Sequence, residues 1–225
     1  MIVSMSDAYA AWSCLPVPWQ RAFEAAWASW RAGSAAVGAA ITSPEGTIVA
    51  VGQNRMMDQP GGPGPLTGIP MAHAEMNALA SLPAAASYDS YEGYKLYTTY
   101  EPCFMCTATL TSTYRIPSVA FGANDPTWDG LLEALRRYPT IRTWLPEREH
   151  LGGRFGALAY VLHVTGLLRH WPGTYEAHER LVPASLALCR RIVEYGSVSQ
   201  LSEADAGIAD VASALWSDLE EIAGA

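Results

Sequence analysis

The chain reads LYTTYEPCFMC over residues 96–106, and this stretch decides the fold class. Its first half is rich in Tyr and Thr, as is typical of a β-strand, which we predict over residues 94–99. Pro102 follows the strand, and residues 103–115 have the composition of a helix that opens on Cys103. A strand that passes directly into a helix indicates an α/β protein.

The residues around this stretch continue the alternation of helices and strands. The other elements predicted within residues 1–126 are helices over residues 17–33 and 73–82, and strands over residues 36–42, 47–52 and 118–122. The first two strands flank a Ser-Pro-Glu-Gly turn and therefore form a hairpin. Residues 56–71 contain four Pro and four Gly, so they predict a long loop with a functional role.

The pattern changes after Pro126. The remaining predicted elements are helices over residues 129–138, 154–170, 174–196 and 203–223. Pro183 is expected to kink or split the third of them. The sequence thus predicts two parts, an α/β domain over residues 1–126 and a C-terminal helical extension over residues 127–225.

Composition limits the classes of function. The chain has 225 residues, half of them hydrophobic, and a net charge of −8. Neither part is basic, which argues against a protein that grips a long phosphate backbone and favours a small, uncharged substrate. The longest apolar run, residues 155–168, is too short to cross a bilayer. Four cysteines without a disulfide framework favour a reducing, cytoplasmic setting.

His73, Cys103 and Cys106 form a candidate metal site. Zinc prefers imidazole and thiolate ligands. The two cysteines are three residues apart at a helix start, so both sulfurs can reach one point, and the helix N-terminus stabilises thiolates. A Cys-x-x-Cys pair alone is equally compatible with a redox pair or half of a structural zinc site. No fourth ligand motif is present, so these three ligands leave one position for an acidified water.

Glu75 lies two residues after His73, in the first turn of its predicted helix. From there its carboxylate can reach the zinc-bound water without being a ligand. It can take a proton from that water and deliver it to a ring nitrogen and then to a departing amine. The combination of His-Ala-Glu with Pro-Cys-x-x-Cys therefore favours catalytic rather than structural zinc.

The same motifs match the signature H-x-E…P-C-x-x-C of zinc deaminases. The chain resembles the cytidine deaminase-like superfamily, and especially the branch of bacterial tRNA adenosine deaminases and guanine deaminases. The resemblance extends over about residues 18–126. The stretches that carry it are residues 37–39, 52–55, 72–79, 96–106 and 121–125. It implies a three-layer α/β/α fold with a mixed five-stranded sheet, one zinc ion per chain, and homodimers whose neighbours help to close the pocket.

The resemblance also implies roles for individual residues. By position, His73, Cys103 and Cys106 would hold zinc and Glu75 would be the proton shuttle. Asn54 would donate a hydrogen bond to the substrate, although an Asn at this place can also simply cap a turn. The backbone N–H groups of Ala74 and Cys103 would help to hold the substrate.

Further side chains are candidates on composition alone. Met71, Phe104 and Trp128 are expected to line a pocket that stacks a flat ring, whereas Phe121 is expected in the core. His163, His170 and His178 allow a second metal site, but ordinary packing is the stronger expectation. Cys14 and Cys189 are expected to be buried as small hydrophobes.

These observations predict hydrolytic deamination of a free nucleobase, nucleoside or related amino-heterocycle, guanine-like or cytosine-like. One alternative is a deaminase acting on adenosine in tRNA or another polynucleotide. The 56–71 loop is long and rich in Pro and Gly for the tRNA-acting enzymes, and the negative net charge does not suit them. The helical extension has no counterpart in the minimal fold of the family. The other alternative is an inactive zinc scaffold that binds a protein partner, against which the intact Glu75 argues.

Overall fold

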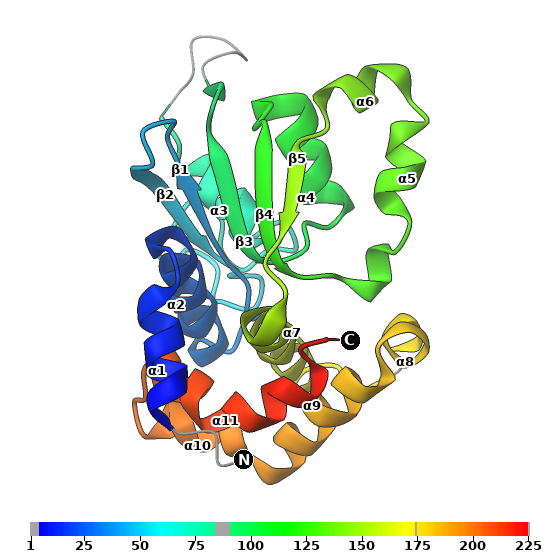
Figure 1. Ribbon diagram of the computed structural model, residues 1–225. Coiled ribbons are helices and arrows are strands. Elements are labelled where there is room, and N and C mark those ends of the chain that lie inside the picture. Colours follow the sequence, from blue (N-terminus) through cyan, green and yellow to red (C-terminus); the bar gives the residue numbers. More distant parts are fainter. Residues whose placement is uncertain (1–4, 84–90, 174, 225) are drawn as a thin grey trace.

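The computed structural model describes residues 5–83, 91–173 and 175–224. Its centre is a five-stranded sheet with the strand order β2-β1-β3-β4-β5 (Figure 1). The strands are β1 (Gly38–Thr42), β2 (Ile48–Gln53), β3 (Lys95–Tyr100), β4 (Ser118–Ala123) and β5 (Glu147–His150). Strand β1 runs antiparallel to β2 and β3, whereas β3, β4 and β5 are parallel, so the sheet is mixed as expected.

Helices cover both faces of this sheet. Helix α2 (Val17–Arg31) and helix α7 (Gly153–Leu168) lie on one side, and helix α3 (Ala74–Ala80) and helix α4 (Phe104–Ala108) lie on the other (Figure 1). The sheet permits this close packing through glycines. A Cβ atom at Gly38 would lie 2.0 Å from the carbonyl oxygen of Ala22 in α2, and one at Gly52 would lie 2.1 Å from that of Ala74 in α3. The three-layer architecture is confirmed.

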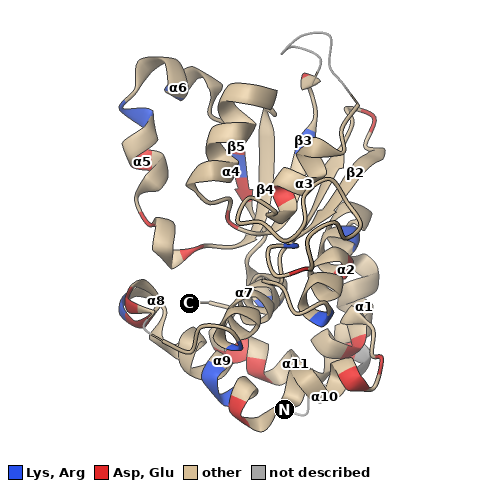
Figure 2. Cartoon of the chain, turned by 180° about the vertical axis from the view of Figure 1, so that it is seen from behind, with Lys and Arg blue, Asp and Glu red and all other residues tan. Residues whose placement is uncertain are grey.

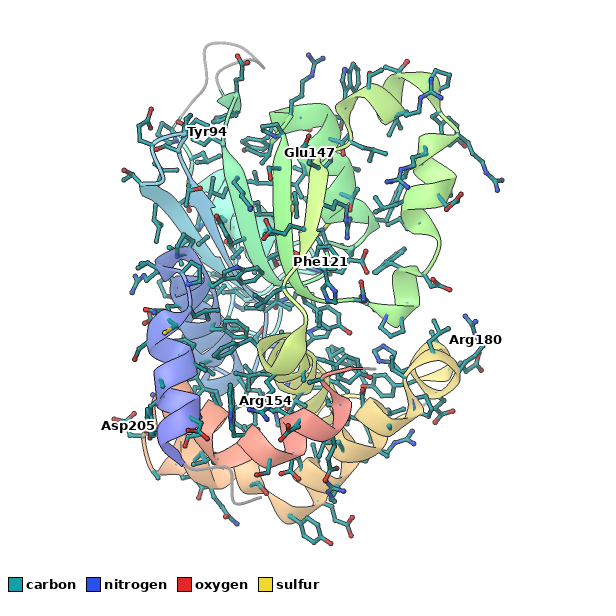
Figure 3. All side chains as sticks on the ribbon, in the orientation of Figure 1. Tyr94, Phe121, Glu147, Arg154, Arg180 and Asp205 are labelled. Atoms are coloured by element: carbon teal, nitrogen blue, oxygen red, sulfur yellow. The ribbon has the colours of Figure 1, made fainter. Side chains whose placement is uncertain are left out.

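The last four helices of the C-terminal extension gather at the foot of the sheet around α7, whereas its two helices within residues 131–144 lie beside the edge strand β5 (Figure 1). The remaining helices are α1 (Met5–Cys14), α5 (Leu131–Arg136), α6 (Pro139–Trp144), α8 (Glu176–Leu181), α9 (Pro183–Tyr195), α10 (Ser197–Glu203) and α11 (Ile208–Ile222). Arg154 of α7 pairs with Glu220 of α11 at 2.6 Å and lies over the ring of Trp216 (Figure 3). One hydrophobic core runs from α1 through the sheet to α11.

The extension differs from the sequence-based expectation in one main respect. Residues 127–225 were expected to add only helices, but they contain β5, which pairs with β4 and completes the sheet. This strand reads EREH and is mostly exposed at the sheet edge. It therefore lacks the apolar alternation that reveals a strand in a sequence. The division of the chain at residue 126 stays a prediction.

The helix expected over residues 103–115 changes its geometry part of the way along. After α4 the chain forms a π-helix, Thr109–Tyr114. Side-chain hydroxyls bond backwards to carbonyl oxygens along this segment, as Thr111 does to Thr107 at 2.6 Å and Ser112 to Ala108 at 2.6 Å. Such bonds compete with regular helical pairing, so the Thr-rich composition gives a physical reason for the departure.

The remaining predictions about helices and buried cysteines had mixed outcomes. Pro183 separates α8 from α9, as predicted, while residue 174, the expected start of that helix, lies outside the described residues. Helices α1, α6 and α10 were not predicted. Cys189 is buried, but Cys14 is exposed, so the expectation of a buried Cys14 was wrong. Within the described segments, no helix combines the length and the apolar character needed to cross a membrane.

Candidate active site

His73, Cys103 and Cys106 lie together at the ends of two helices. His73 is the N-cap residue of α3 and Cys103 is the N-cap residue of α4. Both have an extended backbone conformation. The Nδ1 atom of His73 lies 3.6 Å from Sγ of Cys103 and 3.5 Å from Sγ of Cys106, and the two sulfurs are 3.5 Å apart. The three predicted ligands thus form one cluster.

The size of this cluster matches a zinc site. Tetrahedral zinc with Zn–S bonds of about 2.3 Å and Zn–N bonds of about 2.0 Å separates its ligand atoms by roughly 3.5–3.8 Å. The three measured separations lie between 3.5 and 3.6 Å. One imidazole and two sulfurs are also the donors that zinc prefers. His73, Cys103 and Cys106 therefore fit one zinc ion per chain, with room for a fourth ligand.

The metal-free cysteines form a coupled pair. The pKa of Cys103 falls to about 4, because the Cys106 thiol and His73 hydrogen-bond to the Cys103 thiolate. The pKa of Cys106 rises well above its usual value, because that thiol donates to Cys103 and is buried. One thiolate is thus available before a metal binds, and metal binding must displace the proton that the pair shares.

Glu75 lies beside the cluster without joining it. Its side chain is 3% exposed, and its Oε2 atom is 3.5 Å from Sγ of Cys106. The Oε1 atom is 3.2 Å from the hydroxyl of Thr98 on β3. Burial raises the pKa of Glu75 in the metal-free chain. A buried carboxyl group next to the three candidate zinc ligands, with its pKa raised, is suited to exchange protons.

His73, Glu75 and Cys103 line a cavity of about 420 Å³. Asn54, Phe104 and Trp128, three of the predicted substrate contacts, line this cavity. The other two predicted contacts do not line it. Ala74 is fully buried against β2, and the Met71 side chain is 49% exposed. Among the described residues that line the cavity there is no Lys or Arg. Charged residues are instead spread over the helices and strand ends (Figure 2).

Asn54 is oriented by residues that sequence reasoning missed. Its Oδ1 atom accepts hydrogen bonds from the hydroxyl of Ser34 at 2.9 Å and from the backbone N–H of Met56 at 3.1 Å. The Ser29 hydroxyl donates to its backbone carbonyl at 2.7 Å. With the amide oxygen engaged, the Nδ2 atom has no hydrogen-bond partner among the described residues and remains free to donate into the cavity. Nothing in the sequence around Ser34 signals this role.

Glu101 supports the loop at the cavity wall. One of its oxygens pairs with Arg148 of β5, and the other accepts from the backbone N–H of Asp125 at 3.0 Å. Arg148 also lies over the ring of Phe121, which is buried, as expected (Figure 3). Asp125 itself lines the cavity, and burial raises its pKa to about 6. Strand β5 therefore contributes to the site although it follows residue 126.

The three histidines that allowed a second metal site lie in separate environments. The Nδ1 atom of His178 is 2.7 Å from the hydroxyl of Tyr160, and His170 bonds to the carbonyl oxygen of Gly33. His163 lines the cavity. Within the described residues, His73, Cys103 and Cys106 are the one group placed to hold a metal. The stronger expectation, ordinary packing, describes His170 and His178, whereas the position of His163 was not foreseen.

Comparison with known protein families gives a match for the part of the chain that contains the candidate zinc ligands. Residues 18–123 match the family model described as the cytidine and deoxycytidylate deaminase zinc-binding region. The matched residues include the three candidate zinc ligands, Glu75 and Asn54.

Several solved structures are also similar to the chain. A guanine deaminase from Nitrosomonas europaea is 20% identical, over 79% of this chain and 83% of that chain, with a TM-score of 0.42. A guanine deaminase from Bacillus subtilis is 27% identical, over 52% of this chain and 67% of that chain, with a TM-score of 0.36. A structure from work on A-to-I editing by tRNA:A34 deaminases is 20% identical, over 58% and 94% of the two chains, with a TM-score of 0.45.

Proposed function

Because residues 18–123 match the zinc-binding region of cytidine and deoxycytidylate deaminases, we propose that this chain is a hydrolytic deaminase. It replaces an amino group on a heteroaromatic ring with a carbonyl oxygen and releases ammonia. One observation carries the proposal. The Glu75 carboxylate lies 3.5 Å from a sulfur of a His-Cys-Cys cluster of zinc dimensions, and it lines a cavity large enough for a small molecule.

His73, Cys103 and Cys106 would hold zinc, which would supply an acidified water as the nucleophile near neutral pH. Glu75 performs the proton transfers. Its carboxylate takes a proton from the attacking water and passes it to the ring nitrogen beside the amino-bearing carbon. It then takes the second proton of the added oxygen and passes it to the departing amine, so that ammonia leaves and a carbonyl group remains. Burial of Glu75 at 3% exposure keeps bulk water away from these transfers.

Asn54 positions the ring in this proposal. Its Oδ1 atom is fixed by Ser34 and Met56, so its Nδ2 atom donates a hydrogen bond to a ring nitrogen or exocyclic oxygen of the substrate. Phe104 and Trp128, which also line the cavity, supply apolar faces for a flat ring.

The substrate class is a free nucleobase or nucleoside, guanine-like or cytosine-like. A polynucleotide or nucleotide brings phosphate groups that Lys or Arg side chains usually hold. The described residues that line the cavity include neither, and they do include the acidic Glu75, Glu101 and Asp125. The charge of the lining therefore supports an uncharged ring over the alternative of adenosine in tRNA.

The test is ammonia release by the zinc-loaded full chain across a panel of aminopurines, aminopyrimidines, aminotriazines and their nucleosides. We expect turnover of at least one free base or nucleoside. Glu75→Gln keeps the size of the side chain and should retain zinc while losing at least about 10³-fold in kcat. Glu45→Gln, in an exposed turn, is the control and should behave as the wild type. Absence of ammonia from every ring, or a fully active Glu75→Gln variant, would refute the proposal.

A further inference from the structure

His163 occupies an unusual position in an apolar helix. Helix α7 is hydrophobic on nearly all sides, and its residues around this position, Leu162 and Val164, are fully buried. The His163 side chain instead lines the same cavity as Glu75 and Asn54. It comes from a part of the chain beyond residues 18–123, which carry the family match. The extension therefore contributes a polar side chain to the cavity.

The His163 imidazole has no hydrogen-bond partner among the described residues. Its Nδ1 atom is buried without a partner, and no other hydrogen bond of this side chain is present in the described segments. Buried polar groups are nearly always paired, because an unpaired one loses its bonds to water without replacement. A Leu or Phe here would pack on the same neighbours at no such cost. Both ring nitrogens of His163 thus lack a protein partner among the described residues, and a ligand in the cavity that this residue lines can supply one.

The ring plane of His163 is already fixed. Its centroid lies 4.0 Å from that of Tyr100, and the two planes are inclined by 35°. Tyr100 ends β3, three residues before Cys103 of the metal cluster. Burial, with the nearby His178 and His73, lowers the pKa of His163 to about 3. The imidazole is therefore neutral at physiological pH and offers one donor and one acceptor nitrogen in a fixed orientation.

We propose that His163 is a specificity-determining residue that forms one hydrogen bond with a lactam group of the substrate, meaning a ring carbonyl with its neighbouring ring N–H. This inference rests on the proposed function. It narrows the substrate class to amino-oxo heterocycles, in which the lactam lies in the same ring as the amino-bearing carbon. A site built to hydrogen-bond such a group discriminates strongly against analogues that lack it.

The experiment uses pairs of rings that differ in the lactam. Cytosine is compared with 4-aminopyrimidine, and guanine with 2-aminopurine, each pair sharing the amino-bearing carbon. The quantity measured is kcat/KM for the ring with the lactam divided by kcat/KM for the ring without it, in the pair that the wild type turns over. His163→Phe and His163→Leu both remove the ring nitrogens. We expect each to lower this ratio by roughly 10- to 100-fold, mainly because kcat/KM falls for the ring that carries the lactam. His170→Phe makes the same change at an exposed histidine and should leave the ratio unchanged.

A second readout separates this inference from the proposed function. Dissociation constants of uracil against 4-pyrimidinone, and of xanthine against 2-hydroxypurine, are measured by calorimetry on the zinc-loaded full chain. If no ring releases ammonia, but the wild type binds uracil or xanthine, which keep the lactam of the substrate, more tightly than its counterpart and His163→Phe does not, the proposed function fails and the role of His163 stands. If ammonia is released and both His163 variants keep the wild-type ratios, the role of His163 is refuted and the function stands.

Discussion

The hydroxyl of Thr98 donates a hydrogen bond of 3.2 Å to Oε1 of Glu75. The same hydroxyl lies 3.1 Å from the carbonyl oxygen of Tyr100. With a single proton, it donates to one of these oxygens at a time. When the hydroxyl donates to the carbonyl oxygen of Tyr100, its oxygen can accept a hydrogen bond from a protonated Glu75. Thr98 is thus placed to hold the Glu75 carboxyl in both of its protonation states.

We predict that Thr98→Val lowers kcat by about tenfold, the equivalent of about 1.4 kcal/mol, since the isosteric change removes the hydroxyl that bonds to Glu75 and to the Tyr100 carbonyl oxygen. Zinc content and KM should stay near wild-type values, because Thr98 is neither a metal ligand nor part of the cavity lining. The measurement is steady-state ammonia release with metal analysis. Thr111→Val removes a buried hydroxyl that bonds only within its own helix, and it should leave kcat unchanged. An equal effect of both variants would assign the loss to general destabilisation.

Metal removal should destabilise the fold, because zinc joins the starts of α3 and α4. A metal present at about 1,000 times its dissociation constant stabilises the native state by about 4 kcal/mol. For a chain of this size that corresponds to a fall in Tm of roughly 10 °C on chelation. Thermal unfolding followed by circular dichroism, with and without chelator, measures this shift. Cys103→Ser should unfold at the chelated temperature under both conditions, whereas Cys14→Ser, at an exposed cysteine, should keep the full shift.

Gly52 sets the distance between β2 and the helix that carries Glu75. A Cβ atom at this position would lie 2.1 Å from the carbonyl oxygen of Ala74 and 2.4 Å from the nitrogen of Ala78. Both are backbone atoms, so the helix must move. We predict that Gly52→Ala lowers the free energy of unfolding by about 1–3 kcal/mol and reduces kcat. Urea denaturation measures the first and ammonia release the second. Gly173→Ala, where nothing lies within 4 Å of the added Cβ, is the control and should be neutral.

The sequence predicted those parts of the fold whose residues face the core. The apolar strands at residues 36–42 and 118–122 and the helix after Pro183 follow patterns that burial imposes. Strand β5 escaped because its side chains lie at an exposed edge. There, backbone pairing with β4 decides the structure and leaves no trace in the composition.

The same distinction applies to the site. His73, Glu75, Cys103 and Cys106 were predictable because their chemistry depends on local spacing at two helix starts. Ser34 and His163 were not, because Ser34, in the turn after α2, and His163, in α7, reach the site only through the tertiary arrangement of the chain. A histidine among apolar residues in α7 gives no sign in the sequence of which cavity it faces. Met71 was expected to line the pocket, yet the 56–71 loop places it on the surface.

Asp125 should make stability depend on pH in the metal-free chain. Burial, as the largest cause, raises its pKa from 3.8 to about 6. Between these values the folded state binds more protons at this residue than the unfolded state does. The contribution of Asp125 is therefore most favourable below about pH 4, declines as pH rises towards 6, and is constant above that. Asp125→Asn removes this dependence, and its amide oxygen can still accept from the N–H of Thr127, as Oδ1 of Asp125 does at 2.9 Å.

We accordingly predict that Asp125→Asn matches the wild type in the free energy of unfolding near pH 4 and exceeds it by about 1–3 kcal/mol at pH 8. Urea denaturation of both proteins in chelator, at intervals of half a pH unit, measures the difference. Asp218→Asn, at an exposed surface pair with Arg191, provides a control in which the difference stays small throughout. A constant difference between Asp125→Asn and the wild type from pH 4 to 8 would contradict the prediction. The raised pKa would then not be a property of the folded state, because only a pKa that changes on unfolding makes stability depend on pH.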